Sequence, residues 1–322
     1  MHPGASRHVN LLIIGAAKCG TTTLHRHLAA LPGAYFSPLK EPNFHARADI
    51  DPARFSASFR ANHRDDLAAW LDGPRPPRAI GFVRELADYD RLFEAADPAR
   101  HAVIGEASTT TLWAPSALAS VQALHPTARI LVALRHPAER MRSHWGMARK
   151  YGFTLDDFRT AVERDMAAAD PGWGQTELFY ELGCYARQLA PWLAAWPADR
   201  IRVVLTEELS DPATWAGLAD WVGLEAPKGW AEQAAAPGAR ANVGGRARFE
   251  RLNVWLTRSG WKGRLAAAVP RGMKARLKRG FYADGAAPDW SAGDREWAVL
   301  RYADEVRELE RLLGRTLPDW KR

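Results

Sequence analysis

The sequence lacks the features that mark disulfide-rich, secreted or membrane-spanning proteins. Its 322 residues include only two cysteines, Cys19 and Cys184, which are too few for a disulfide framework. The N-terminus, Met1 to Asn10, has no charged start, apolar stretch and small-residue cleavage site of a secretory signal. No apolar run approaches the roughly 18 residues that cross a bilayer. We therefore expect a cytoplasmic protein in a reducing compartment.

Motifs for several common chemistries are also missing. The sequence has no HExxH or CxxC pair, so no metal site is expected. It has no G-x-S-x-G motif to support a hydrolase. Its fourteen tryptophans accompany no nucleic-acid-binding motif, so a nucleic acid is not an expected partner. No feature of the sequence predicts an oligomeric state.

The charge balance is basic, with 44 Lys and Arg against 37 Asp and Glu, a net charge of +7. Such an excess suits an anionic ligand, an anionic partner or a membrane surface without choosing among them. Trp261 to Lys278 is basic and partly amphipathic, which is typical of a segment that touches an anionic surface. Pro270 and Gly272 interrupt it, so peripheral membrane contact is the less favoured interpretation.

Short apolar runs alternate with helical stretches along the chain. This pattern predicts an α/β fold, with a P-loop-type parallel sheet flanked by helices on both faces in a single domain, residues 1–322. Residues 49–100 read as an insertion near the mouth of the sheet, and residues 233–248, rich in Ala, Gly and Arg, as a mobile loop. The predicted strands are Leu11 to Ile14, Val103 to Gly105, Ile130 to Leu134 and Ile201 to Leu205. The predicted helices include Thr21 to Leu31, Pro115 to Leu124, Pro137 to Lys150, Tyr185 to Trp196 and Asp294 to Leu313.

The strongest motif is the segment Gly15 to Thr22, GAAKCGTT, between a predicted strand and helix. Its glycines let the backbone fold around an anion, and the helix start adds amide donors. An ATP-binding loop would carry lysine directly after the second glycine, but here Thr21 follows it and Lys18 lies three residues earlier. The neighbouring strand ends in Arg135 instead of a magnesium-binding carboxylate. The loop therefore indicates an anionic ligand that is handled without metal.

At these residues the sequence resembles the PAPS (3′-phosphoadenosine-5′-phosphosulfate)-dependent sulfotransferases. The likeness is closest to bacterial members and to heparan-sulfate and other carbohydrate sulfotransferases. Their 5′-phosphosulfate loop is similar to Gly15 to Leu24, with the lysine in the same displaced position. The resemblance implies that Lys18 contacts the phosphosulfate and its bridging oxygen. It also implies a 5′-phosphate cradle made of Cys19, Gly20, Thr21, Thr22 and Thr23.

Two further segments concern the 3′-phosphate of the donor. Ile130 to Trp145 resembles the family motif in which a strand ends in arginine and a proline-started helix bears a serine. The resemblance implies that Arg135 and Ser143 bind the 3′-phosphate. Asn242 to Arg248 is a weaker match that would fold over the adenosine or its 3′-phosphate, with Arg246 as the contact.

The candidate general base lies in Leu39 to Phe44, which resembles the K-E-P-x-F-F segment of carbohydrate sulfotransferases. The resemblance implies that Glu41 removes the acceptor proton. His45 replaces the second phenylalanine and is an alternative base, because an imidazole titrates near neutrality. Glu106 would orient the acceptor or share the role of base. The alternative for Glu41 is a simple ion pair with Lys40 or an arginine.

The resemblance thus implies a sulfotransferase that moves a sulfuryl group from PAPS, its co-substrate, to an acceptor hydroxyl of a carbohydrate, glycolipid or small metabolite. Residues 49–100 would form a wall on the acceptor side. Two alternatives stay open. One is a P-loop kinase that uses Lys18 for ATP and Glu207 or Glu208 for magnesium. The other is a catalytically inactive nucleotide-binding adaptor.

Overall fold

Five parallel strands form the central sheet of the computed structural model, which describes residues 4–63, 66–239, 245–259, 261, 282–284 and 290–321. Their order across the sheet is β2-β3-β1-β4-β5, and each neighbouring pair is parallel. The central strands are buried and apolar except for Glu106 in β3 and Arg129 at the start of β4, as in a sheet that is covered on both faces. The predicted parallel α/β fold is therefore confirmed. The strands are β1 (Leu11–Gly15), β2 (Ala34–Phe36), β3 (Val103–Ala107), β4 (Arg129–Leu134) and β5 (Ile201–Leu205).

By contact density the chain divides into two compact units. The first comprises Met1–Asp49, Asp65–Arg135 and Arg187–Ala241, and it contains the whole five-stranded sheet. The second comprises Ile50–Arg64, His136–Ala186 and Asn242–Arg322. The assignment of residues 1–322 to one sulfotransferase domain stays a prediction.

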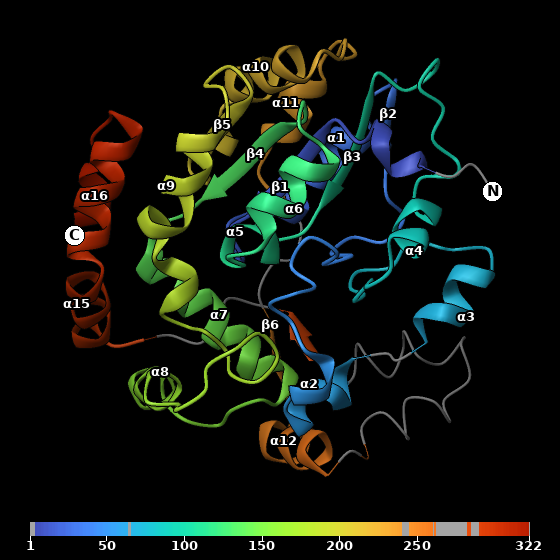
Figure 1. The fold of residues 1–322 in the computed structure, drawn as a ribbon. Helices are drawn as coiled ribbons and strands as arrows, with labels where there is room; N and C mark the ends of the chain where they lie inside the picture. Colours follow the sequence, from blue (N-terminus) through green and yellow to red (C-terminus); the bar gives the residue numbers. More distant parts are fainter. Residues whose placement is uncertain are drawn as a thin grey trace. The chain divides into compact units, whose positions relative to one another are not determined.

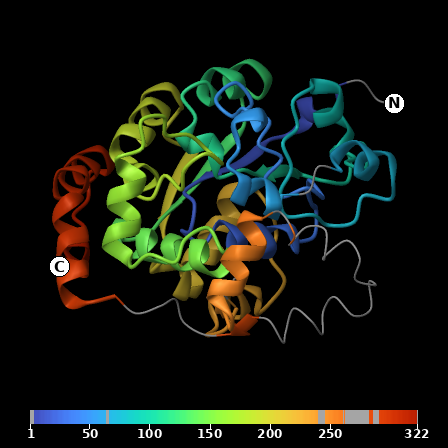
Figure 2. The ribbon, with the colours of Figure 1, turned by 90° about the horizontal axis from the view of Figure 1, so that it is seen from below.

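Helices cover both faces of the sheet in the first unit (Figures 1 and 2). The crossovers from β1 to β2 and from β3 to β4 run in opposite directions, so right-handed connections place α1 and α6 on opposite faces. On the α1 face, the rings of His27 and Trp215 meet at 5.0 Å between centroids, and those of Trp215 and Trp230 at 5.8 Å. The helices are α1 (Thr21–Ala29), α3 (Leu67–Asp72), α4 (Leu86–Arg91), α5 (Thr110–Trp113), α6 (Ala117–Leu124), α10 (Pro212–Val222) and α11 (Trp230–Ala235); α9 (Tyr185–Ala195) begins in the second unit.

The second unit is mainly helical. Its antiparallel strand pair joins β6 (Gly245–Ala247) to β7 (Tyr282–Asp284). Its helices are α2 (Ala57–Asn62), α7 (Pro137–Tyr151), α8 (Phe158–Met166), α12 (Glu250–Arg258), α15 (Ala292–Arg301) and α16 (Ala303–Leu313). The short 3-10 helices of the chain are η1 (Ala5–His8), η2 (Pro52–Arg54), η3 (Glu181–Gly183), η4 (Glu208–Ser210) and η5 (Pro318–Lys321).

The predicted C-terminal helix from Asp294 to Leu313 is wrong in one respect, because the structure has two helices there. They meet at Tyr302, whose backbone leaves helical geometry at φ −99° and ψ 5°. The Tyr302 ring is fully buried, and its hydroxyl lies 2.9 Å from Tyr180 O and 3.3 Å from Phe179 O. Burial of this one aromatic side chain thus accounts for a break that hydrophobic periodicity does not reveal.

Two segments predicted to be irregular lie only partly within the described residues. Residues 49–100 include η2, α2, α3 and α4 and divide between the two units. Of residues 233–248, the first three complete α11 and 245–247 form β6, whereas 240–244 lie outside the described residues. The assignments of an acceptor-side insertion and a mobile loop stay predictions.

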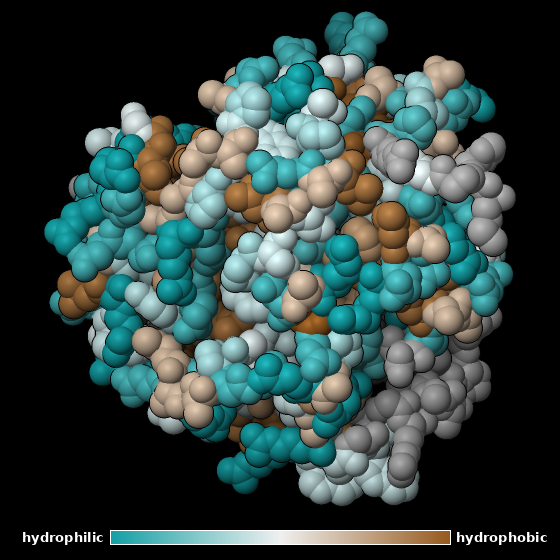
Figure 3. Space-filling model, in the orientation of Figure 1, coloured by the Kyte–Doolittle hydropathy of each residue, from teal (hydrophilic) through white to brown (hydrophobic). Residues whose placement is uncertain are grey.

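One face of the surface is of mixed polarity. Over the face drawn in Figure 3, hydrophilic side chains separate the hydrophobic ones. Among the described helices, none combines the length and the apolar character that a membrane crossing requires. Cys19 and Cys184 are both buried free thiols.

Candidate active site

The loop between β1 and α1 is held at both ends by glycines that no other residue replaces easily. A Cβ on Gly15 would lie 2.6 Å from the Cβ of Leu112, so α5 can pack against the end of β1 only at a glycine. Gly20 precedes the first residue of α1 with φ +92°, a left-handed conformation that favours glycine. Between them, the amide of Ala16 donates to Ala133 O at 2.7 Å. The loop is thereby fixed to β4.

Lys18 lies at the turn of this loop, with φ +69° and a half-buried side chain. Within the described residues, the amides of Ala17, Gly20 and Thr21 donate to no backbone carbonyl. Donor amides at a helix start beside a lysine form an anion site of the kind that phosphate loops use. The loop therefore fits the 5′-phosphosulfate of PAPS.

The other predicted cradle residues differ in burial. Thr22 is half-buried, whereas Thr21 and Thr23 are buried. Cys19 is fully buried, and its amide donates to Ala16 O at 3.2 Å.

Thr206 supports the candidate site, and the sequence alone did not predict this role. Its hydroxyl lies 2.8 Å from Cys19 O and 3.0 Å from Leu134 O, so it joins the phosphate loop to the end of β4. Arg135 directly follows Leu134 and is half-buried. Since β1 and β4 are parallel neighbours, the loop and Arg135 lie at the same edge of the sheet. The one sequence feature that could have indicated this role is the position of Thr206 directly after the predicted strand Ile201 to Leu205.

Glu41 is anchored beyond the end of β3, the other neighbour of β1. Its amide donates to Ala107 O at 2.8 Å. One carboxylate oxygen, Oε2, accepts from the Thr109 amide at 2.6 Å and from the Thr109 hydroxyl at 3.1 Å. The other, Oε1, pairs with Lys40, and both side chains are about seven-eighths buried, with 14% of Lys40 and 13% of Glu41 exposed. The two hydrogen bonds from Thr109 to Oε2 and the ion pair at Oε1 hold the Glu41 carboxylate in a defined orientation.

Asn43 is a second supporting residue whose role the sequence did not predict. Its side-chain amide donates to Glu41 O at 2.9 Å and to Gly81 O at 2.7 Å, and its Oδ1 accepts from the Thr110 hydroxyl at 2.8 Å. Asn43 has φ +57° and Glu41 has φ +61°, so the two residues form a turn of left-handed backbone. Asparagine tolerates this conformation better than most residues do. Asn43 thus fixes the backbone that carries Glu41.

Glu106 is buried beneath this turn, with 1% of its surface exposed. Burial, aided by the nearby Glu41 carboxylate, raises the pKa of Glu106 to about 8, and hydrogen bonding with Tyr89 and Ser108 partly offsets the effect. Its Oε2 atom has no hydrogen-bond partner among the described residues. A carboxyl group with this pKa is mostly protonated at pH 7, which suits an orienting role better than that of a base.

His45 lies in the same buried cluster. Its Nδ1 is 3.0 Å from the Ser120 hydroxyl and its Nε2 is 3.3 Å from the Tyr89 hydroxyl. Burial, together with the neighbouring His125, lowers the pKa of His45 well below its usual value. Both ring nitrogens are therefore occupied within the core, and this environment favours Glu41 as the base. The assignments of Glu41, Glu106 and His45 as catalytic residues stay predictions.

Two predicted donor contacts belong to the second unit. Ser143 lies in α7 and is half-buried. Arg246 lies in β6, but its side chain is outside the described part of the structure. Their roles toward the 3′-phosphate stay predictions.

The carboxylates that a kinase would use for magnesium are engaged elsewhere or exposed. Glu208 Oε2 accepts from the Leu205 amide at 2.7 Å, so Glu208 ends β5, and Glu207 is exposed. The described residues contain no cluster of three or more His, Cys, Asp or Glu side chains placed to hold a metal ion.

Solved structures support the fold. The crystal structure of a sulfotransferase from Alicyclobacillus acidocaldarius superposes with a TM-score of 0.65, covering 98% of this chain and 99% of that chain at 22% identity. At this identity the similarity shows the fold alone.

Sequence comparisons extend over the site. Carbohydrate sulfotransferase 15 of Rattus norvegicus is 24% identical over 229 residues, which is 61% of this chain and 40% of that protein. The Homo sapiens protein of the same name is 27% identical over 168 residues, which is 47% of this chain and 29% of that protein. The alignments thus span less than half the length of these curated relatives. The sequence model of the sulfotransferase family matches residues 10–221, a range that includes the phosphate loop, Glu41, Glu106 and Arg135. This chain belongs to the sulfotransferase family.

Proposed function

We propose that this chain transfers a sulfuryl group from PAPS to an acceptor hydroxyl on a carbohydrate. One observation carries the proposal. An anion-binding loop with Lys18 follows β1, and a rigid turn that carries the Glu41 carboxylate is hydrogen-bonded to the end of the neighbouring strand β3, at the same edge of the sheet. Open α/β sheets bind their ligands at this edge.

The donor, when bound, supplies the sulfuryl group and a phosphate leaving group. The start of α1 and the loop amides hold its 5′-phosphate, with Thr22 as a hydroxyl donor. Lys18 balances the negative charge that develops on the bridging oxygen as the S–O bond breaks. Arg135, at the end of β4, pairs with the 3′-phosphate.

Glu41 acts as the general base. Its carboxylate takes the proton of the acceptor hydroxyl while that oxygen forms the new bond to sulfur. Thr109 holds Oε2, and Lys40 holds Oε1, so little reorganisation is needed before the proton moves. Glu106, which is buried near Glu41, stays protonated, so it adds no second negative charge beside the base.

The carbohydrate acceptor rests on the names of the relatives, carbohydrate sulfotransferase 15 of Rattus norvegicus and of Homo sapiens. The kinase alternative is not favoured, because Glu208 is bonded to the backbone of β5. The inactive adaptor is also not favoured, because Glu41 keeps a set of supporting bonds that binding a nucleotide alone does not require.

Titration calorimetry with PAP, the desulfated donor, and with ATP plus magnesium tests the donor. We expect tight PAP binding without metal and no comparable binding of ATP. Radiolabelled PAPS then tests transfer to a panel of sugars, and E41Q should lower kcat by about 10²- to 10⁴-fold with PAP affinity unchanged. Absence of PAP binding, or full activity of E41Q, refutes the proposal.

A further inference from the structure

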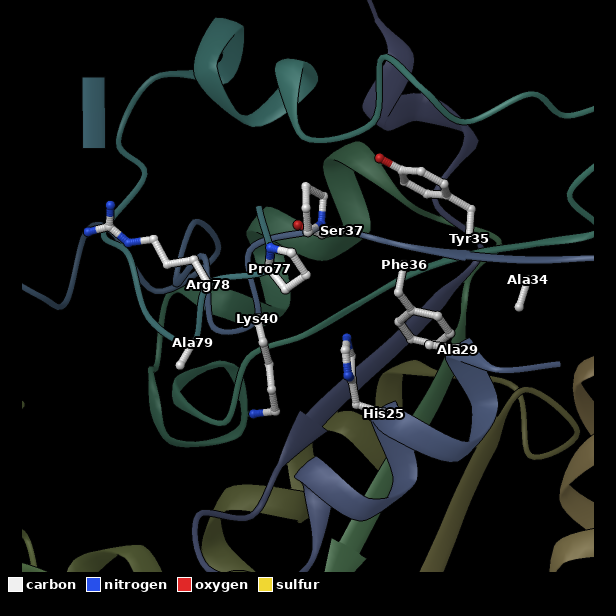
Figure 4. A pocket seen from close by; sticks show the side chains of 11 residues that line it. His25, Ala29, Ala34, Tyr35, Phe36, Ser37, Lys40, Pro77, Arg78 and Ala79 are labelled. Carbon is white, nitrogen blue, oxygen red and sulfur yellow. The ribbon is translucent and has the colours of Figure 1, made fainter. Parts of the chain in front are cut away.

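A cavity of about 500 Å³ in the first unit is lined in part by Lys40, the ion-pair partner of the candidate base Glu41. It lies between α1, β2 and the segment 77–79, and Lys40 reaches into it next to His25 (Figure 4). This volume is within the usual range of small-molecule sites. Most of the residues that line it are apolar: Ala29, Ala34, Phe36, Pro38, Pro77 and Ala79.

Three of the polar lining residues, Tyr35, Ser37 and Arg78, have their polar atoms engaged by residues that do not line the cavity. The Tyr35 hydroxyl donates to Leu92 O at 2.8 Å, and the Ser37 hydroxyl donates to Leu39 O at 2.9 Å. The Arg78 guanidinium pairs with Asp66 at 2.7 Å and points away from Lys40 in Figure 4. These residues therefore leave an apolar wall.

Two polar groups remain at one end of the cavity. Lys40 is already neutralised by its ion pair with Glu41. Burial, together with the Lys40 charge, lowers the pKa of His25 to about 4, so its imidazole is neutral at pH 7. The ring of His25 meets that of Phe36 edge to face, with 5.0 Å between centroids. A polyanion would find little uncompensated positive charge here, whereas a ring or alkyl group would find apolar contacts.

We propose that this cavity binds the apolar aglycone of a small neutral glycoside. A hydroxyl of its sugar is thereby presented to Glu41. The inference rests on the proposed function and names its acceptor class. Lys40 lines the cavity and touches Glu41, so an acceptor seated against Phe36 and Ala29 brings its polar end to the base. The interior of a charged polysaccharide does not suit this lining.

A matched pair of acceptors tests the inference. Methyl β-D-glucoside and 4-nitrophenyl β-D-glucoside carry the same hydroxyls and differ only in the aglycone. With radiolabelled PAPS, we expect the aryl glycoside to have a KM at least about tenfold lower, because its ring leaves water. Ala79 is exposed at the rim, so A79W can obstruct the cavity without disturbing the core. It should raise the KM of the aryl glycoside about tenfold and change that of the methyl glycoside little.

A69W, on the exposed surface of α3 outside the cavity, is the control and should leave both KM values unchanged. Saturation-transfer NMR with the aryl glycoside measures binding without donor, and the signal should fall in A79W. Equal KM values for the two glycosides, absence of the NMR signal, or preference for a polyanionic heparosan chain overturns the inference. Calorimetric titration of each variant with PAP distinguishes failure of this inference from failure of the proposed function. Loss of PAP binding would indicate that the proposed function is wrong.

Discussion

Lys18, Glu41 and Asn43 all have backbone conformations that L-amino acids rarely adopt. Among the described residues they are three of the five non-glycine residues with positive φ, at +69°, +61° and +57°. Left-handed backbone costs roughly 1–2 kcal/mol for a residue with a Cβ, and such strain persists where the surroundings enforce it. Concentration of this strain at the phosphate loop and the Glu41 turn supports a functional role for both.

Lys18 should affect chemistry far more than folding. Its side chain is half-buried at a loop, so K18M should leave the urea midpoint of unfolding nearly unchanged. Loss of its charge at the bridging oxygen should lower kcat by about 10²- to 10³-fold. Stopped assays with radiolabelled PAPS and parallel urea titrations measure the two effects. K228M removes an exposed charge elsewhere and should retain full activity, and a K18M enzyme as active as K228M would refute the role of Lys18.

Glu106 should make stability depend on pH. Its pKa is about 8 in the folded protein, above the ordinary 4.5, so the folded state holds its proton more tightly than the unfolded state does. The stabilisation is complete below about pH 4.5 and is lost as the pH rises through 8. Between pH 5 and pH 9, the unfolding free energy of the wild type should fall by ~4 kcal/mol relative to that of E106Q, which cannot ionise.

Urea titrations of the wild type and E106Q at several pH values measure this difference. E232Q alters an exposed glutamate in α11 and should follow the wild type at every pH. Parallel pH profiles for the wild type and E106Q would show that Glu106 ionises normally in the folded protein.

At the scale of elements, the Glu41 turn depends on the paired segments 38–43 and 78–83. Their backbones are joined by Lys40 N to Arg78 O, Gly81 N to Glu41 O and Val83 N to Pro42 O, at 2.8–3.0 Å. Asn43 completes the pairing through its side chain. The candidate base Glu41 is thus held by a short hydrogen-bonded loop instead of by a strand.

Substitution of Asn43 should loosen this loop and leave the binding of PAP unchanged. N43G retains the freedom to adopt positive φ but removes three side-chain hydrogen bonds, so Glu41 loses its fixed position. We expect kcat to fall about tenfold, with the PAP dissociation constant unchanged, by assay and calorimetry. N62A, on α2 in the second unit, should change neither. Equal losses of PAP affinity and kcat would instead indicate general unfolding of the site.

The sequence predicted the elements that follow simple rules. The apolar runs at β1, β3, β4 and β5 and the glycine-bounded loop were all recognisable, because buried parallel strands and phosphate loops have local patterns. The three-residue strand β2 was too short to show a period. Asn43 and Thr206 were missed because their roles arise from contacts with residues distant in the chain, such as Gly81 and Leu134.

At the scale of the whole molecule, binding of the donor should appear as stability. A ligand that binds only the folded state adds about 2.7 kcal/mol to the unfolding free energy at 100 times its dissociation constant. PAP should therefore raise the melting temperature, and AMP, which lacks the 3′-phosphate, should raise it less at equal concentration. Rising salt should reduce the shift, because the attraction between the phosphates and basic side chains is screened.

Arg135 should account for the difference between the two nucleotides. R135M removes the charge that we assign to the 3′-phosphate, so PAP and AMP should then raise the melting temperature equally. The control is R129M, because Arg129 begins β4 and so lies at the opposite edge of the sheet. It should keep the larger shift with PAP, since a guanidinium there cannot reach a ligand at the carboxyl edge. If R135M still distinguishes PAP from AMP as the wild type does, another residue recognises the 3′-phosphate.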